Sequence, residues 1–214
     1  SNMKTRNPLR RPFEYKYKRY SLYIILINTV LFFLSPYFPR IDIYLPLNPI
    51  AILKYKMYWQ FATYMFVHGS FSHLFFNMLG LLVFGLQVEK TIGSKEFLLF
   101  YFLTGIFSGL CSFGYYYFTG QFNVSLLGAS GAVYSILFAY AVLYPRSTFL
   151  VWGIIPIPAP ILVLIYTIIE LGSQIFTNSN VAHYTHLFGF FTAWLYFVIR
   201  MGIHPIKIWK NAYR

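Results

Sequence analysis

Charge of either sign is scarce in this sequence. Charged residues make up 10% of the 214 residues, against roughly 25% in an ordinary soluble domain. Only 5 residues are acidic, and 58% of the chain is hydrophobic. So few charges cannot cover the surface of a soluble domain, and so much apolar sequence excludes a disordered chain. The composition therefore predicts a polytopic helical membrane protein.

Cysteine is almost absent as well. Cys111 stands alone, so no intrachain disulfide can form and a disulfide-stapled scaffold is excluded. Ser1 and Asn2 precede Met3, and we interpret these two residues as a cloning scar.

Six segments are apolar enough to cross a membrane, which requires about 20 mostly apolar residues. They run approximately from Tyr20 to Tyr37, Phe71 to Val88, Phe97 to Tyr117, Leu127 or Gly128 to Tyr144, within Thr148 to Phe176, and from Val181 to Met201. In the fifth segment, closely spaced prolines exclude regular helix before about Pro158. The long first connection, about 38–70, is rich in aromatic and apolar residues. We expect it to lie in the outer membrane interface.

Lysine and arginine predict the orientation of these spans. If the spans alternate in direction, fourteen of the 17 basic residues fall on the side of the two termini. The other three are Arg40, Lys54 and Lys56, all in the first connection. The positive-inside rule then puts both termini in the cytoplasm. We expect a basic cytoplasmic tail over 1–19, a six-span core over 20–202 and a second basic cytoplasmic tail over 203–214. The net charge of +12 is thus explained by membrane orientation, and no nucleic-acid partner is predicted.

Polar residues gather where the second, fourth and sixth spans enter from the outer side. These clusters are Ser70–Asn77, Gly128–Gly131 and His183–Gly189. Polar groups at membrane depth must find partners inside the protein. Three clusters at one depth therefore predict a shared hydrated site.

Each polar residue has a structural and a catalytic interpretation. Ser130 lies among small residues, which is typical of helix packing, but it is also placed to act as a nucleophile at a helix N-terminus. His186 is either a buried hydrogen-bonded histidine or a general base. His73 and Asn77 share one helix face, as an interhelical clamp or as donors to an oxyanion. Tyr134, four residues after Ser130, packs on His186 or simply fills the core.

A metal site and a catalytic triad are both disfavoured. The histidines at 68, 73, 183 and 186 have no cysteine or carboxylate among them and no H-x-x-x-H spacing, so we predict no metal. Glu170 is the only acid expected inside a span, which favours a Ser/His dyad over a triad. The roles of His68, His183 and Glu170 stay open.

Taken together, these motifs resemble the rhomboid intramembrane serine proteases of the bacterial six-span type, over about residues 59–202. The motifs are His73-x-x-x-Asn77, Gly128-Ala-Ser-Gly131, Tyr134, Val88-Glu89-Lys90 followed by Gly93-Ser94, Ile155-Pro-Ile-Pro-Ala159, and Val181–Gly189. Two departures are Ala193, where a second glycine is common, and Trp59-Gln60 in place of Trp-Arg. The second departure puts arginine-based bracing of the first connection in doubt.

The resemblance implies a role for each matching residue. Ser130 is the nucleophile and His186 the general base and later the general acid. The oxyanion hole consists of His73, Asn77 and the Ser130 N–H. The supporting residues are Gly128, Gly131, Tyr134 and Gly189.

The resemblance also implies partners and location. The substrates are membrane-spanning proteins, the lipid bilayer is a partner, and no cofactor or metal takes part. We expect a multi-pass integral protein of a bacterial inner (plasma) membrane. Two rival hypotheses are a catalytically inactive rhomboid-like binding or chaperone protein, and a transporter that uses the same polar cavity.

Overall fold

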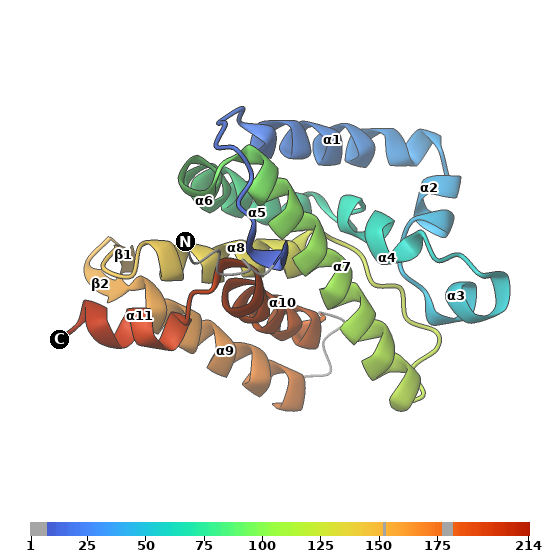
Figure 1. The fold of residues 1–214 in the computed structure, drawn as a ribbon. Coiled ribbons are helices and arrows are strands. Elements are labelled where there is room, and N and C mark those ends of the chain that lie inside the picture. The colour runs from blue at the N-terminus through green and yellow to red at the C-terminus, as the bar shows by residue number, and fades with distance from the viewer. Residues whose placement is uncertain (1–7, 152, 177–181) are drawn as a thin grey trace.

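The structure of this chain is a computed structural model that describes residues 8–151, 153–176 and 182–214. Its long helices form a bundle in which α1 and α9 lie on opposite sides of α8 and α10 (Figure 1). The helices are α1 (Tyr20–Leu34), α5 (Phe71–Gly80), α6 (Leu86–Ile92), α7 (Ser94–Phe118), α8 (Ser130–Leu143), α9 (Ala159–Phe176) and α10 (His183–Tyr196). Two π-helical segments extend them: η4 (Leu81–Gly85) joins α5 to α6, and η5 (Phe197–Met201) continues α10.

Each of the six predicted apolar segments overlaps one of these helices or a continuous run of them, and the second and third helical runs extend beyond the predicted bounds, to Ile92 and over Ser94–Phe118. Among the described residues, three runs are long and apolar enough to cross a membrane: Tyr20–Tyr37, Phe71–Ile92 and Ser94–Thr119. A fourth, His183–Met201, passes the same test together with α11 (Pro205–Ala212), which is bent from it by 94°. The remaining two, α8 and residues Ala159–Ile169 of α9, are apolar but shorter.

The first connection follows η2 (Ser35–Tyr37), which ends the first span. It is built from the short helices α2 (Arg40–Tyr44), α3 (Pro49–Tyr55), α4 (Gln60–Thr63) and η3 (Tyr64–Phe66). Gln60 occupies the position at which arginine is common in the family that the sequence resembles. Gln60 holds this connection together through hydrogen bonds. Its side chain is fully buried, accepts the Asn48 N–H at 3.0 Å and donates to the Tyr44 carbonyl at 3.2 Å.

Residues 148–158 depart from the all-α prediction. They form an antiparallel hairpin of β1 (Thr148–Val151) and β2 (Ile155–Pro158), with Thr148 opposite Pro158 and Leu150 opposite Pro156. The Ala159 N–H donates to the Ser147 carbonyl at 2.9 Å. Since bonded and non-bonded pairs alternate along an antiparallel ladder, both prolines fall in non-bonded pairs, where a missing N–H costs nothing.

The predicted terminal tails also contain packed structure. In the C-terminal one, α11 lies against the end of α8, where Trp209 Nε1 donates to the Ala141 carbonyl at 2.9 Å. In the N-terminal one, η1 (Pro8–Arg10) reaches the end of the sixth predicted span, and Arg10 Nε donates to the Ile199 carbonyl at 3.2 Å. Neither contact was predicted from the sequence.

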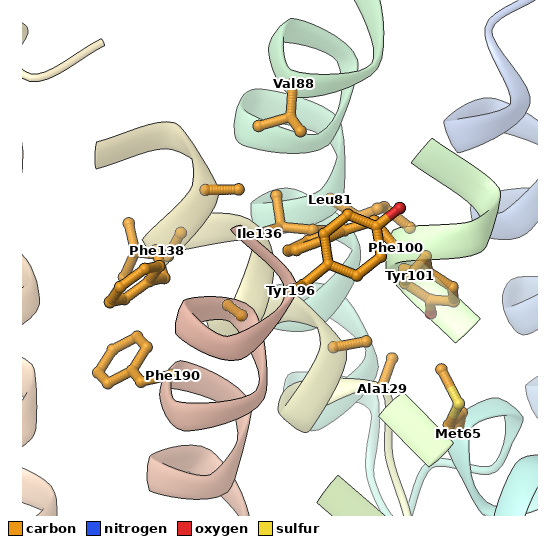
Figure 2. Packing of buried hydrophobic residues seen from close by; sticks show 14 of the residues in the cluster. Met65, Leu81, Val88, Phe100, Tyr101, Ala129, Ile136, Phe138, Phe190 and Tyr196 are labelled. Atoms are coloured by element: carbon orange, nitrogen blue, oxygen red, sulfur yellow. The ribbon is translucent and has the colours of Figure 1, made fainter. Parts of the chain in front are cut away.

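The centre of the hydrophobic core is α8. It is buried on all sides, as expected of a helix that is apolar all round. Figure 2 shows Ile136 and Phe138 of α8 among buried side chains of α7, α10 and the η4–α6 run. At about 1.5 Å of rise per residue, the 14 residues of α8 span about 21 Å, less than the roughly 30 Å of a bilayer core. A helix this short begins below the membrane surface when its other end reaches the opposite side.

Glu89, part of the Val88-Glu89-Lys90 motif, fixes the start of α1. Its carboxylate is fully buried and accepts the N–H groups of Tyr20 at 2.7 Å and Ser21 at 2.9 Å. It also accepts the hydroxyls of Ser21 and Ser94. A carboxylate at this position satisfies N–H groups that have no helical acceptor and complements the helix dipole.

Candidate active site

A cavity of about 880 Å³ opens between the starts of α5, α8 and α10. Of the predicted site residues, Ser130, Tyr134, His73, Asn77 and His186 line it. Other residues at the starts of α5 and α10 complete the wall, together with residues of α7 and of the 121–127 segment, which include Gln121, Asn123 and Ser125. Three segments far apart in the sequence therefore meet at the site that the polar clusters predicted.

Ser130 is the first residue of α8, and a glycine turn presents it. Gly128 has a φ of +111°, in the region that L side chains rarely adopt. A Cβ on Gly128 would lie 2.6 Å from the His73 ring and 3.6 Å from Asn77 Nδ2. Only glycine therefore allows the backbone before Ser130 to approach His73 and Asn77 this closely.

Two hydrogen bonds hold this turn. The Gly128 N–H donates to the Tyr64 carbonyl at 2.9 Å, and the Ala129 N–H donates to His68 Nε2 at 3.3 Å. His68 is buried, and burial, followed by the proximity of His73, lowers its pKa to about 4. The neutral ring can accept the Ala129 N–H, whereas a doubly protonated ring has no acceptor.

His68 is the residue whose role the sequence left open. It lies 61 positions before its partner Ala129, so no local pattern could have connected them. The only available signal was its position in a polar segment five residues before His73.

His186 lies against Tyr134. The two rings stack with centroids 4.2 Å apart and planes at 6°. Phe190 and Tyr166 contact the tyrosine ring, with centroids 5.2 Å and 6.0 Å away. Of the two interpretations of Tyr134, the structure has the one in which it packs on His186, and the histidine ring lies at the wall of the cavity. His183 lies nearby, with its ring centroid 6.3 Å from that of His186.

Close packing of α8 on α10 sets this geometry. A Cβ on Gly189 would overlap the Gly131 carbonyl oxygen, which is backbone and cannot turn aside. Ser135 donates to the Gly189 carbonyl at 2.7 Å and to the Gly131 carbonyl at 3.0 Å. Small residues and hydroxyl bonds of this kind let membrane helices approach closely.

His73 and Asn77 face the cavity from the first turns of α5. Ser70 caps this helix by accepting the His73 N–H at 3.2 Å. Asn77 Nδ2 is buried, and no acceptor for it is found among the described residues. A buried amide donor next to the Gly128–Ser130 turn is suited to a negatively charged oxygen.

Among the described residues, no group of three or more His, Cys, Asp or Glu side chains is arranged to hold a metal ion. The side chain of Glu170 lies outside the described structure, and so do residues 177–181, the last of which is the predicted start of the sixth span.

A family model described as the rhomboid domain matches residues 55–202, which include every element of this cavity. The chain therefore belongs to the rhomboid family, and with its apolar helices it is an integral membrane protein.

Among its relatives, rhomboid protease GluP of Bacillus subtilis is 33% identical over 145 residues, which cover 67% of this chain and 27% of that protein. RHOMBOID-like protein 4 of Arabidopsis thaliana is 27% identical over 153 residues, 72% of this chain and 36% of that one. Rhomboid protease GlpG of Yersinia pestis is 30% identical over 89 residues, 42% and 30% of the two chains. The chain thus spans between 27% and 36% of the length of these three relatives.

The α8–α10 contact yields a stability prediction. We expect Gly189→Ala to lower the free energy of unfolding by about 1–3 kcal/mol, because the added methyl group pushes against the Gly131 backbone. The matched control is Gly114→Ala in α7, where an added Cβ would meet nothing within 4 Å. That change should be neutral or slightly stabilising. Thermal unfolding in detergent measures both, and equal midpoints for the two variants would contradict the close-contact account.

His68 yields a pH prediction. Its pKa falls from 6.5 to about 4 on burial, so the unfolded chain binds one more proton than the folded chain between these values. Stability contributed by His68 is therefore lost as pH falls through 6.5 toward 4. In His68→Gln, whose side-chain oxygen can still accept the Ala129 N–H, the unfolding midpoint should drop less between pH 7 and pH 5 than in the unmodified chain. The control is His204→Gln at an exposed histidine. The control should keep the pH dependence of the unmodified chain, whereas a His68→Gln variant that kept it in full would refute this assignment.

Proposed function

We propose that this chain is an intramembrane serine endopeptidase that hydrolyses peptide bonds in or near membrane-spanning segments through a dyad of Ser130 and His186. The observation that carries the proposal is the convergence of Ser130, His186, His73 and Asn77 on one cavity. Membership of the rhomboid family supports it, since the relatives GluP and GlpG are named as rhomboid proteases.

In the proposed mechanism, a ring nitrogen of His186 takes the proton of Ser130 as Oγ attacks the carbonyl carbon of the scissile bond. The carbonyl π electrons move to oxygen, which becomes an oxyanion. When this intermediate collapses, the C–N bond breaks and the leaving amine takes the proton from His186. Water then attacks the acyl-enzyme with His186 as base, the C–Oγ bond breaks, and Ser130 regains its proton.

The oxyanion hole in this proposal consists of the Ser130 N–H with the side chains of His73 and Asn77. The first N–H groups of a helix have no acceptor within it, and they carry the positive end of the helix dipole. The Gly128 turn brings them next to the side chains of α5. Donors fixed before the reaction stabilise developing charge without further reorganisation.

We also propose the six-span arrangement with both termini in the cytoplasm of a bacterial inner membrane. The short α8, buried on all sides, supports a site below the outer surface, because the irregular backbone of residues 119–129 then lines a cavity inside the protein. The transporter alternative requires polar groups through the whole depth. Beyond the cavity, α8 instead buries the apolar side chains of Ile136, Leu137 and Phe138, and its buried Ser135 is hydrogen-bonded to the Gly131 and Gly189 carbonyls.

The proposal is tested by cleavage of a single-span substrate in proteoliposomes. We expect Ser130→Ala and His186→Ala each to reduce the rate by at least about 10³-fold. Ser125→Ala, at a second serine of the same cavity, should cleave normally. Cleavage that survived Ser130→Ala would rule out the serine mechanism. A folded, unmodified chain that cleaved no substrate would instead favour the inactive binding or chaperone alternative.

The oxyanion role of Asn77 is tested separately. Removal of one such donor typically costs about 10²–10³ in kcat, and we expect this loss for Asn77→Ala. KM should change little, because the donor acts on charge that develops only in the transition state. Circular dichroism and the unfolding midpoint check that the variant is folded. A raised KM with unchanged kcat would assign Asn77 to substrate binding instead.

A further inference from the structure

The C-terminal helix α11 is built as an amphipathic helix at a right angle to the span before it. The bend from His183–Met201 to Pro205–Ala212 is 94°. Gly202 makes this bend with a φ of +69°, and the Arg10 side chain packs against Gly202. Since α10 crosses the bilayer in the proposed arrangement, α11 lies in the plane of the membrane surface.

One face of α11 is fixed to the rest of the protein. Pro205 is buried, and the Trp209 ring lies 5.4 Å from that of Phe138 in addition to its bond to Ala141. At the far end, Arg146 Nε donates to the Ala212 carbonyl at 3.0 Å. The orientation of the helix about its own axis is therefore determined by packing.

The opposite face is basic and exposed. Lys207 and Lys210 are three residues apart, hence on one side of the helix, and both are exposed. Ile206 and Ile208 flank them and are 55% and 37% exposed. Residues 203–214 include no acidic residue. A helix with a basic outer face and apolar flanks is the form that binds at an anionic lipid surface.

A hollow beside α11 extends this basic surface. It has a volume of about 630 Å³ and is lined by residues of the 143–147 turn and of α11, including Arg146, Ser147 and Asn211. A guanidinium, a hydroxyl and an amide are the donors that phosphate oxygens accept from.

We propose that α11 and the 143–147 turn form a binding surface for anionic phospholipid of the cytoplasmic leaflet. The lysines attract the headgroups, and Arg146 with its polar neighbours contacts a phosphate in the hollow. Charge complementarity selects this partner, because the basic face has no acidic residue to pair with and lies at headgroup depth. The proposal does not depend on the chemistry of Ser130, so loss of protease activity leaves it untouched.

The test compares the full chain in vesicles of phosphatidylcholine alone with vesicles that contain about 30% phosphatidylglycerol. We expect the anionic lipid to raise the thermal unfolding midpoint, and added salt to reduce this rise. In Lys207→Gln/Lys210→Gln the rise should fall by about half or more. The matched control is Arg40→Gln/Lys54→Gln, which removes the same charge from exposed positions in the first connection. It should keep the full rise.

Two results would overturn the proposal. One is an equal rise for the lysine variant and the unmodified chain. The other is a rise produced by inorganic phosphate in phosphatidylcholine vesicles, which would make the surface a site for a free anion. The two lysines are exposed, so their replacement preserves the Trp209 and Arg146 contacts and the variant can be compared with the unmodified chain.

Discussion

A helix that begins below the membrane surface needs protein partners for the backbone in front of it. In the proposed arrangement that helix is α8, and the Tyr64 carbonyl and His68 Nε2 are the partners of the backbone before it. Water is the alternative partner, and the polar lining of the cavity can hold it there. The start of α8 is costly to bury because its backbone groups need partners. The same need makes it a place where water can meet the Ser130 hydroxyl.

The walls of this cavity depend on small residues and hydroxyl groups between helices. There is no hydrophobic driving force between helices in lipid, so close packing and hydrogen bonds hold them together. Ser112 and Thr185 are 2.7 Å apart across α7 and α10, and Ser135 connects α8 to α10 below them. Rigid walls allow the Tyr134 ring to hold His186 in one orientation.

Much of the fold and of the site follows from local pattern. The apolar runs predicted the first helix to end near Tyr37, where η2 ends, and the fifth to start at Pro158, one residue before α9. The polar clusters predicted which residues share a cavity because each lies at the start of a span. These features depend on composition along a single segment, which the sequence displays directly.

The missed features depend on contacts between distant segments. The α11 helix has only 8 residues, too few for stability alone, and it is held by Trp209 and Arg146. The hairpin depends on pairing across a turn, and the role of His68 depends on a loop 61 residues away. The family resemblance put bracing of the first connection in doubt, because glutamine replaces arginine at position 60. Gln60 braces the connection through its contacts with Asn48 and Tyr44.

In the proposed mechanism His186 activates Ser130 as a nucleophile at the bottom of the cavity. Activation of Ser130 is measured most directly by reaction of the folded chain with a fluorophosphonate, followed by mass spectrometry of the labelled peptides. We expect a single adduct on Ser130 that is lost on unfolding and in His186→Ala. An adduct on another residue, or labelling of Ser130 that is unaffected by His186→Ala, would contradict this mechanism.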